Sequence, residues 1–301
     1  HEVLEVADRI TVLRRGQVAG NTTPKATNDE QLAEMMVGRD VQLTVARGKS
    51  KPARNVLHVA NLSVRDERGR LAVDGVDLDV RAGEIVAIAG VQGNGQTELV
   101  EALTGLRAVE AGSASLDGEP LDLGSPRKIA DAGVAHIPED RNRDGMIKGM
   151  TIAENLMMNA YHRAPFSKNG RLDLQAISAN ASRAIQDFDV RTPSAQVFIG
   201  TLSGGNQQKV IVAREFSRDV KLVIAAQPTR GLDVGSIEYI HKKIVERRDA
   251  GAAVLIVSTE LDEVMALGDR IAVMYQGRLM GILEGAEATR ERIGLLMGGV
   301  S

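Results

Sequence analysis

The chain has 301 residues, of which 43% are hydrophobic, so it is long enough for about two domains and a sizeable buried core. Its net charge of −3 and aromatic content of 2% argue against a nucleic-acid partner, which would need a basic surface and stacking rings. The absence of cysteine excludes disulfides, thiolate metal sites and cysteine nucleophiles. No apolar run approaches the roughly 18 residues of a membrane-spanning helix, so a membrane role would require a partner.

The two ends of the chain repeat one another. Glu2–Gly20 matches Glu263–Gly281 at a constant offset of 261 residues, and the match continues without a gap to Gly38 and Gly299. A period of this length indicates tandem domains and not a solenoid. A polar, basic stretch follows the first copy, as expected of a linker. The chain is thereby expected to contain three parts: the C-terminal tail of a first domain (1–42), a linker (43–54) and a complete second domain (55–301).

The second domain is predicted to begin with strands and a glycine-rich loop. Val56–Leu62 and Leu71–Val80 alternate like antiparallel strands, whereas Glu84–Ala89 is a continuous apolar run typical of a buried parallel strand. The loop Gly90–Thr97 follows this run and precedes an expected helix, Thr97–Leu106. Glycines in this context let backbone N–H groups surround a phosphate. Taken alone, a structural turn explains them equally well. The candidate phosphate-binding residues are Gly90, Gly93, Asn94, Gly95, Gln96, Thr97 and Glu98.

A helical block is predicted in the middle of the chain, at about 125–200. A further strand is expected at Gly133–Pro138, before this block becomes mainly helical. Thr151 and Glu154 have the spacing of a capping box, which indicates a helix start. From there to about Val197 we expect mainly helix, with breaks at Pro165 and Gly170.

The segment Leu202–Lys209 places a Ser-Gly-Gly turn before an expected helix. Such a turn is common as a simple N-cap. Here Val220–Ala226 follows as a buried strand, and Pro228–Asp233 comes directly after it, which favours a functional interpretation. The turn would present a hydroxyl and backbone N–H groups to a phosphate held by another subunit. The candidate residues for this contact are Leu202, Ser203, Gly204, Gly205, Asn206 and, at the end of the later segment, Asp233.

The last predicted elements complete an α/β core. Ser236–Ala250 is expected to be a crossover helix leading to a buried strand, Ala253–Ser258, and Ile271–Tyr275 with Arg278–Leu283 should form a closing hairpin. Strands that alternate with helices around an inserted helical block indicate a P-loop α/β domain with an antiparallel β portion and a helical subdomain.

With these motifs, from Leu57 to about Gly299 and in the N-terminal tail, the chain resembles the ATP-binding subunits of bacterial ABC importers for simple sugars and nucleosides. The resemblance implies a P-loop NTPase fold of the ABC type and ATP with Mg²⁺ as cofactors. The glycine-rich loop then corresponds to the Walker A motif, Val220–Gln227 to the Walker B motif, and Leu202–Lys209 to the signature motif. The loop and the Walker B stretch look most like the second domain of nucleoside-type members.

The resemblance also implies that most catalytic positions are degenerate. Gln96 stands in place of the phosphate-binding lysine, Ala226 in place of the metal-organising aspartate and Gln227 in place of the general base. Alanine cannot hold a metal-bound water, and an amide is a poor base. Glu139 occupies the position that usually holds glutamine, and Thr259 the position of the switch histidine. Only Thr97 remains as a weak metal ligand.

Two binding functions are implied by the family geometry. The intact signature at Ser203 is expected to complete the ATP site of the absent first domain, while the chain's own loop forms a degenerate site. No aromatic residue precedes Tyr161, so Arg65 is the candidate for stacking on adenine.

The implied partners are the first ABC domain, transmembrane permease subunits and, indirectly, a substrate-binding lipoprotein, with no nucleic acid. The implied location is peripheral, at the cytoplasmic face of the bacterial cell membrane. The alternative is a tandem ABC protein without a transport role, which would act as a nucleotide-dependent regulatory or scaffold clamp.

Overall fold

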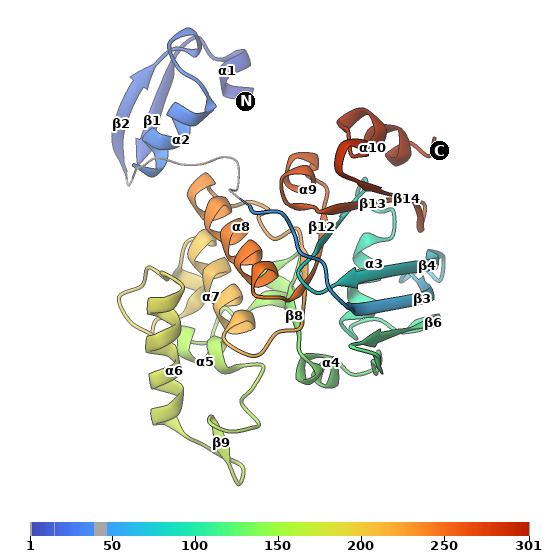
Figure 1. The fold of residues 1–301 in the computed structure, drawn as a ribbon. Coiled ribbons are helices and arrows are strands. Elements are labelled where there is room, and N and C mark those ends of the chain that lie inside the picture. Colours follow the sequence, from blue (N-terminus) through green and yellow to red (C-terminus); the bar gives the residue numbers. More distant parts are fainter. Residues whose placement is uncertain (1, 15, 39–46, 301) are drawn as a thin grey trace.

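The computed structural model describes residues 2–14, 16–38 and 47–300, and the statements below concern these residues (Figure 1). The expected linker and the end of the expected N-terminal tail therefore lie partly outside the described residues. Among the helices that the structure describes, none combines the length and the apolar character needed to cross a membrane.

A six-stranded sheet forms the centre of the fold. β14 pairs with β13 in antiparallel fashion, and all other neighbours in the sheet are parallel. Every residue of β5 and β11 is buried, as the continuous apolar runs in the sequence predict for strands covered on both faces. In spatial order the strands are β14 (Arg278–Glu284), β13 (Arg270–Tyr275), β5 (Ile85–Ala89), β12 (Ala253–Ser258), β11 (Leu222–Ala226) and β8 (Val134–Ile137).

A second, antiparallel sheet covers one face of the first. The predicted strands at 56–62 and 71–80 are both present, and each is longer than predicted. Two further strands were not predicted, because Val109–Leu116 contains small polar residues and glycine and has only two buried positions. Their spatial order is β4 (Leu71–Arg81), β3 (Asn55–Arg65), β6 (Val109–Leu116) and β7 (Glu119–Pro120). One hydrophobic core fills the space between the two sheets and α3 (Gln96–Leu103).

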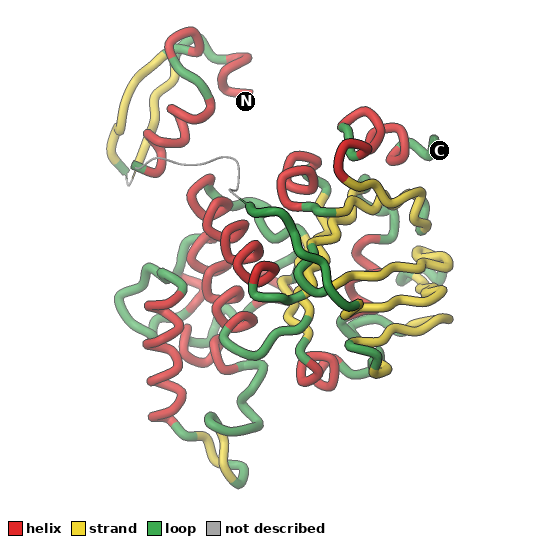
Figure 2. The backbone as a smooth tube through the Cα atoms, viewed as in Figure 1, coloured by secondary structure: helices red, strands yellow, loops and turns green. Residues whose placement is uncertain are grey.

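The other face of the six-stranded sheet packs against a group of helices (Figure 2). The predicted capping box is present, since the Thr151 hydroxyl accepts from the Glu154 N–H and the Glu154 carboxylate accepts from the Thr151 N–H. These helices are α5 (Ile152–Met157), α6 (Leu174–Asp187), α7 (Gly204–Phe216) and α8 (Val234–Asp249). Two helices near the C-terminus, α9 (Leu261–Leu267) and α10 (Arg290–Met297), contribute to the same core, whereas α4 (Pro126–Ala132) contributes Ile129 to the core between the two sheets.

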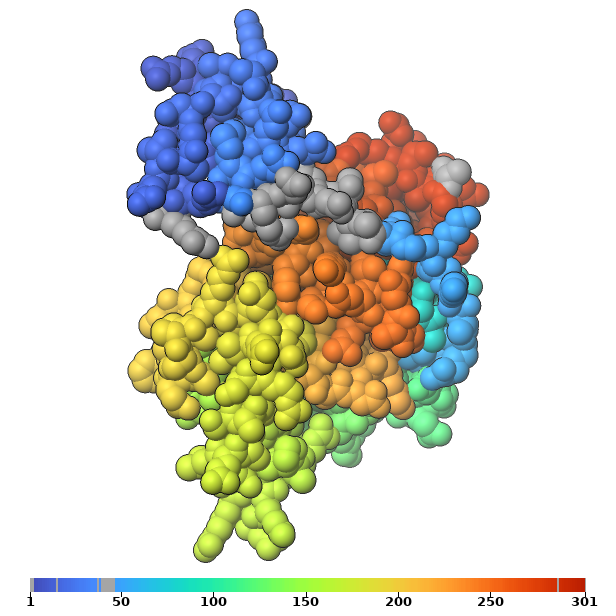
Figure 3. Space-filling view, turned by 60° about the vertical axis from the view of Figure 1, so that its left-hand side comes forward, coloured from blue at the N-terminus to red at the C-terminus, as the bar shows by residue number. Residues whose placement is uncertain are grey.

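Two predictions about the helices were wrong in their extent. α3 ends at Leu103 because Gly105 adopts a φ of 75° just beyond it. The stretch expected to be helical up to Val197 contains a small hairpin, β9 (Ser167–Lys168) and β10 (Arg171–Leu172), which projects from the molecule at the lower edge of Figure 3. After α6 ends at Asp187, the next helical turn begins only at Ile199. β8, although inside 125–200, belongs to the six-stranded sheet.

The sequence repeat is also a repeat in structure. The N-terminal unit has the same element order as the C-terminal end of the chain, and its hairpin has the same register. Both hairpins shift register at the equivalent point, after Val12 in the first and after Val273 in the second. The repeated elements are α1 (Glu2–Val6), β1 (Ile10–Arg14), β2 (Gln17–Thr22) and α2 (Asp29–Val37), matching α9, β13, β14 and α10.

The two copies differ in what covers them. β13 has β5 as a second neighbour, whereas β1 pairs only with β2 within the described chain. Leu13 is 65% exposed, and its equivalent, Met274, is fully buried. Val6 is 83% exposed, and its equivalent, Leu267, is also fully buried. The N-terminal unit therefore exposes apolar side chains at positions that are core in the second copy.

Hydrogen exchange should separate the two copies. We expect the amides of Ile10–Arg14 to exchange much faster than those of Arg270–Tyr275, the same strand in the second copy, and than those of Ile85–Ala89. The reason is that β1 has one open edge and an exposed leucine, so it opens locally at low cost. The measurement is native-state exchange of the monodisperse monomer. Equally slow exchange in β1 and β13 would contradict the expectation.

Candidate functional site

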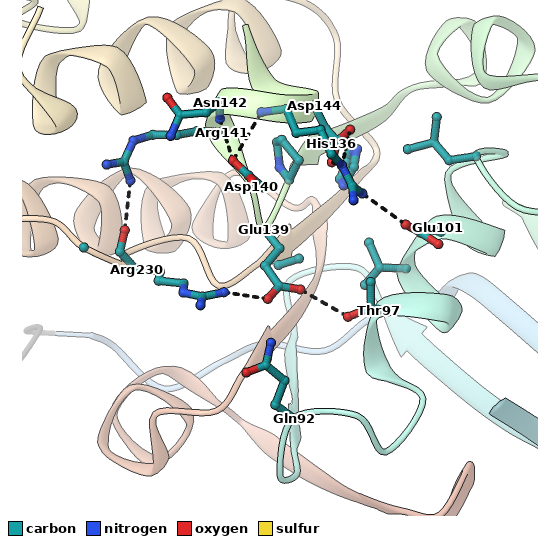
Figure 4. Close-up of a pocket in the computed structure, with 16 residues that line it drawn as sticks. Gln92, Thr97, Glu101, His136, Glu139, Asp140, Arg141, Asn142, Asp144 and Arg230 are labelled. Carbon is teal, nitrogen blue, oxygen red and sulfur yellow. Dashed lines mark hydrogen bonds and ion pairs between the residues drawn. The ribbon is translucent and has the colours of Figure 1, made fainter. Parts of the chain in front are cut away.

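The loops that follow four neighbouring strands meet at the carboxyl edge of the six-stranded sheet. In a parallel sheet this edge is the usual place for a ligand site. The four strands are β5, β8, β11 and β12, and they bring together the glycine-rich loop, Glu139, Gln227 and Thr259. A cavity of about 550 Å³ opens beside this edge, lined among others by Thr97, Glu139 and Arg230 (Figure 4).

The glycine-rich loop Gly90–Thr97 is packed so closely that glycine is required at two positions. A Cβ on Gly95, which has a φ of 103°, would lie 2.1 Å from the carbonyl oxygen of Ala72. A Cβ on Gly90 would lie 2.7 Å from the carbonyl oxygen of Met274. The loop is thus shaped by the antiparallel sheet on one side and by β13 on the other.

The rest of the loop is fixed by hydrogen bonds. Gly93 adopts a φ of 88° at the turn. The Asn94 Oδ1 accepts a hydrogen bond from the Gln276 N–H at 2.9 Å, which joins the loop to the turn between β13 and β14. Glu98 lies in the first turn of α3. The predicted loop-to-helix arrangement is therefore present.

The side chain of Gln96 is directed into the loop that it belongs to. Its Oε1 accepts a hydrogen bond from the Asn94 N–H at 3.1 Å, and its Nε2 donates to the Val91 carbonyl oxygen at 3.1 Å. The sequence identified Gln96 as a neutral replacement for a lysine. It did not indicate that the amide bonds to the loop backbone.

Thr97 and Glu139 are brought together, although they are 42 residues apart. The Thr97 hydroxyl donates to the Glu139 Oε2 at 3.1 Å, and the Arg230 guanidinium donates to the Glu139 Oε1 at 2.8 Å. Glu139 is therefore neutralised by a cation and bonded to the one hydroxyl predicted to bind a metal (Figure 4).

Three further positions that the resemblance predicts to be catalytic lie next to each other but hold neutral groups. Ala226 ends β11 and is buried. Gln227 follows with a φ of 46°, a left-handed conformation that costs energy in a residue other than glycine. Its Nε2 donates to the Thr259 Oγ1 at 3.1 Å, so the two side chains bind each other. The part of this edge between the glycine-rich loop, Ala226 and Thr259 provides no carboxylate free to organise a metal or accept a proton.

The signature candidate lies at the start of α7, away from the glycine-rich loop. Ser203 is the N-cap residue of this helix, but its hydroxyl caps no backbone N–H; it accepts instead from the Asn206 Nδ2 at 3.0 Å. Leu202 packs against the core beneath. The first N–H groups of α7 are therefore not capped by the side chain that precedes them, and they form the positive end of a 13-residue helix.

The two glycines of this turn are enclosed by other elements. A Cβ on Gly205 would lie 2.1 Å from the Ser236 Oγ, and a Cβ on Gly204 would lie 2.8 Å from the Arg141 guanidinium. Asp233 is the N-cap of α8 and accepts from the Ser236 N–H at 3.0 Å. The signature turn and the start of α8 are thus packed as one surface.

Sequence reasoning missed three residues of this region. Arg230 neutralises Glu139, and Arg141 donates to the Arg230 carbonyl oxygen at 2.9 Å while contacting the signature turn. Burial lowers the pKa of His136 to about 4, so this cavity-lining imidazole is neutral at pH 7. The two arginines could have been found from their positions, because Arg230 lies within Pro228–Asp233 and Arg141 lies two residues after Glu139. The sequence contains no comparable signal for His136.

Arg65 is held at the side of the antiparallel sheet. Its guanidinium donates to the Gly69 carbonyl oxygen at 2.9 Å and to the Glu110 Oε1 at 3.2 Å. Its suggested role in stacking on adenine stays a prediction.

Mg²⁺-nucleotide does not fit the chain's own glycine-rich loop as it stands. The lysine and both carboxylates that the family pattern requires are replaced, the Thr97 hydroxyl is bonded to Glu139, and the Asn94 N–H is bonded to Gln96. By contrast, the N–H groups at the start of α7 are not capped by Ser203, and a helix N-terminus is suited to a phosphate oxygen.

Comparison with known proteins identifies the family and the fold. Residues 73–230, about half of the chain, match the family model described as ABC transporter. Over 99% of its length the chain is 47% identical to a nucleoside import ATP-binding protein of Lactococcus lactis. It is 45% identical over 98% of its length to a guanosine import ATP-binding protein of Bacillus subtilis, and 45% identical over 99% to a glucose import ATP-binding protein of Haloferax volcanii.

The chain spans only part of these relatives: 59%, 58% and 54% of their respective lengths. Among solved structures, a nucleotide-free ATP-binding cassette from an ABC transporter superposes with a TM-score of 0.68 at 21% identity, covering 80% of this chain and 96% of that one. This likeness shows the fold, and it confirms the predicted ABC-type α/β class.

Proposed function

The chain belongs to the ABC transporter family, and we propose that it comprises the second ATP-binding domain, with the tail of the first, of the ATP-binding subunit of an importer for nucleosides or simple sugars. The observation that carries this proposal is the contrast within the molecule. The signature residues are present and their N–H groups are not capped by the Ser203 side chain, whereas the chain's own loop lacks the groups for metal binding and proton transfer.

The structural repeat supports the presence of a first domain. Leu13 is exposed in the N-terminal unit, whereas the equivalent residue of the second copy, Met274, is fully buried. This difference implies that the N-terminal unit lacks the partner that completes its core. In the second copy that partner is β5, at the edge of which the glycine-rich loop begins. Residues 1–42 are therefore proposed to complete the sheet of a first ABC domain, with 43–54 as the linker to the second.

The signature turn is proposed to complete the first domain's ATP site. The Ser203 hydroxyl and the N–H groups of Gly204, Gly205 and Asn206 would hold phosphate oxygens of an ATP whose Mg²⁺ is bound by the first domain. Bound ATP supplies the phosphoanhydride bond that is hydrolysed. In this chain, Asp233 positions the start of α8 against Gly205, and Arg141 places a cation beside Gly204.

Nucleosides are the favoured substrate class. Ala226 and Gln227 replace the acidic pair that sugar-type second domains more often keep, and two of the three relatives above are named for nucleoside or guanosine import. The glucose relative is as similar as the guanosine relative, so sugars remain the second candidate. The proposed partners are the first ABC domain, transmembrane permease subunits and, indirectly, a substrate-binding lipoprotein. The proposed location is the cytoplasmic face of the cell membrane.

A nucleotide-dependent clamp without a transport role is the alternative. It would need catalytic carboxylates in both copies and, in many such proteins, a long basic linker. The proposed linker is short, and Ala226 and Gln227 remove the acidic pair from this copy, which favours transport.

Uptake measurements test the proposal. In cells that lack the full-length protein, we expect uptake of radiolabelled nucleoside to fall to background, with ribose uptake affected less, and to return when the wild-type gene is supplied. The physical reason is that the permease cannot alternate without its ATP-binding subunit. Unchanged uptake of both solutes would favour the clamp, and selective loss of ribose uptake would assign the subunit to sugars.

A further inference from the structure

We propose that the glycine-rich loop of this domain is closed by the side chain of Gln96, which takes the place of a bound phosphate, so that the loop keeps its shape without nucleotide. The proposal concerns the chain's own loop and is independent of the transported solute and of the signature turn.

The first observation is the two-sided bonding of Gln96. Its oxygen accepts from the Asn94 N–H, one of the loop N–H groups that would otherwise face a phosphate, and its nitrogen donates to the Val91 carbonyl oxygen. The amide of Gln96 thus connects two separate points of the loop backbone. A lysine at this position has no acceptor atom and could not bind the Asn94 N–H.

The second observation is how tightly the amide fits. Gln96 is only 7% exposed although it is the first residue of α3. A Cβ on Gly90 would lie 2.2 Å from the Gln96 Nε2, so the side chain fills the space that the glycine leaves. A polar side chain buried to this degree is normally bonded at both ends, as this one is.

The third observation is that the polar side chains next to the loop are bonded to one another. Arg230, Glu139 and Thr97 form a continuous chain across the mouth of the loop. On the other side the amide of Gln227 is paired with Thr259. The pocket between the loop, Gln227 and Thr259 holds only about 10 Å³, near the minimum for one water molecule, and the larger cavity of about 550 Å³ opens beside it.

These observations assign Gln96 a role opposite to that of a weak phosphate ligand. If the amide competes with an anion for the Asn94 N–H, then removing it should improve anion binding. A glutamine that merely replaces a lysine would make binding weaker when it is removed. The sign of the change therefore decides between the two roles.

The experiment is a calorimetric titration of the 301-residue chain with inorganic pyrophosphate in the absence of Mg²⁺. We expect Gln96→Ala to bind at least about tenfold more tightly than wild type, equivalent to about one net hydrogen bond released to the ligand. Pyrophosphate should also slow amide exchange at Asn94 and Gly95 in the variant and not in the wild type.

Two further variants complete the design. Gln96→Asn keeps an amide that is too short to span the loop and should also bind more tightly, which decides the question if the alanine variant is unstable. Gln175→Ala removes an exposed glutamine of α6, outside the glycine-rich loop, and it should behave as wild type. The proposal is overturned if wild type and both Gln96 variants bind equally, or if tighter binding leaves the exchange of Asn94 and Gly95 unchanged.

Discussion

Ser203→Arg is expected to reduce solute uptake by the full two-domain protein to background. Ser203 is exposed at the N-cap of α7, so the arginine does not disturb the core. Its long side chain would occupy the approach to the N–H groups at the start of α7 that are proposed to hold the phosphate of the first domain's ATP. The measurement is initial-rate uptake of radiolabelled solute by cells that carry each full-length variant at matched expression.

Matched substitutions make this result specific. Ser178→Arg places the same side chain on an exposed serine of α6 and should leave uptake unchanged. Gly204→Asp should be as damaging as Ser203→Arg, because its carboxylate would compete with the phosphate for the helix N-terminus. Its Cβ would also lie 2.8 Å from Arg141. Gln96→Ala should lower uptake only modestly, since its loop does little chemistry. If Gln96→Ala is as damaging as Ser203→Arg, then the assignment of a competent and a degenerate site is wrong.

The 301-residue chain is expected to hydrolyse ATP about 10²–10⁴-fold more slowly than an ABC domain with its general base in place, or not at all. Gln227 has no basic atom, its amide is bonded to Thr259, and Ala226 cannot organise a metal. The measurement is steady-state phosphate release by purified protein, with a Ser203→Arg sample as the control for contaminating ATPases. Turnover at the rate of an intact domain, in a preparation free of contaminants, would contradict this prediction.

A restored variant separates binding from chemistry. Gln96→Lys, Ala226→Asp and Gln227→Glu together should raise the affinity for Mg²⁺-ATP much more than they raise turnover. Thr259 still lacks an imidazole, and the site still needs a signature from an opposing domain. An unchanged affinity in calorimetry would show that this edge of the sheet is not a nucleotide site.

The central strands were predictable because their signal is local. β5, β11 and β12 are continuous apolar runs bounded by polar or glycine-rich segments, and burial on both faces of a parallel sheet requires such a composition. The capping box at Thr151 was predictable for the same reason, since its two hydrogen bonds connect residues three apart.

Elements stabilised by distant contacts were missed or misjudged. Half of the positions in β6 are exposed, and the strand exists because β3 offers it a hydrogen-bonded edge. The hairpin of β9 and β10 has only two residues in each strand, too few for a periodic pattern. In both cases the local sequence carries little preference, and pairing with another segment decides the conformation.

The sequence by itself determined the family and the order of the motifs, because these depend only on residue identity and spacing. Tertiary structure alone decided which contacts the side chains at these motifs make. The pair of Arg230 and Glu139 joins residues 91 apart, and the amide of Gln96 reaches the loop backbone only because the neighbouring β13 and the antiparallel sheet press the loop into its bend. Such contacts are set by the register and packing of whole sheets, which depend on residues far apart in the sequence and cannot be predicted from a short stretch of it.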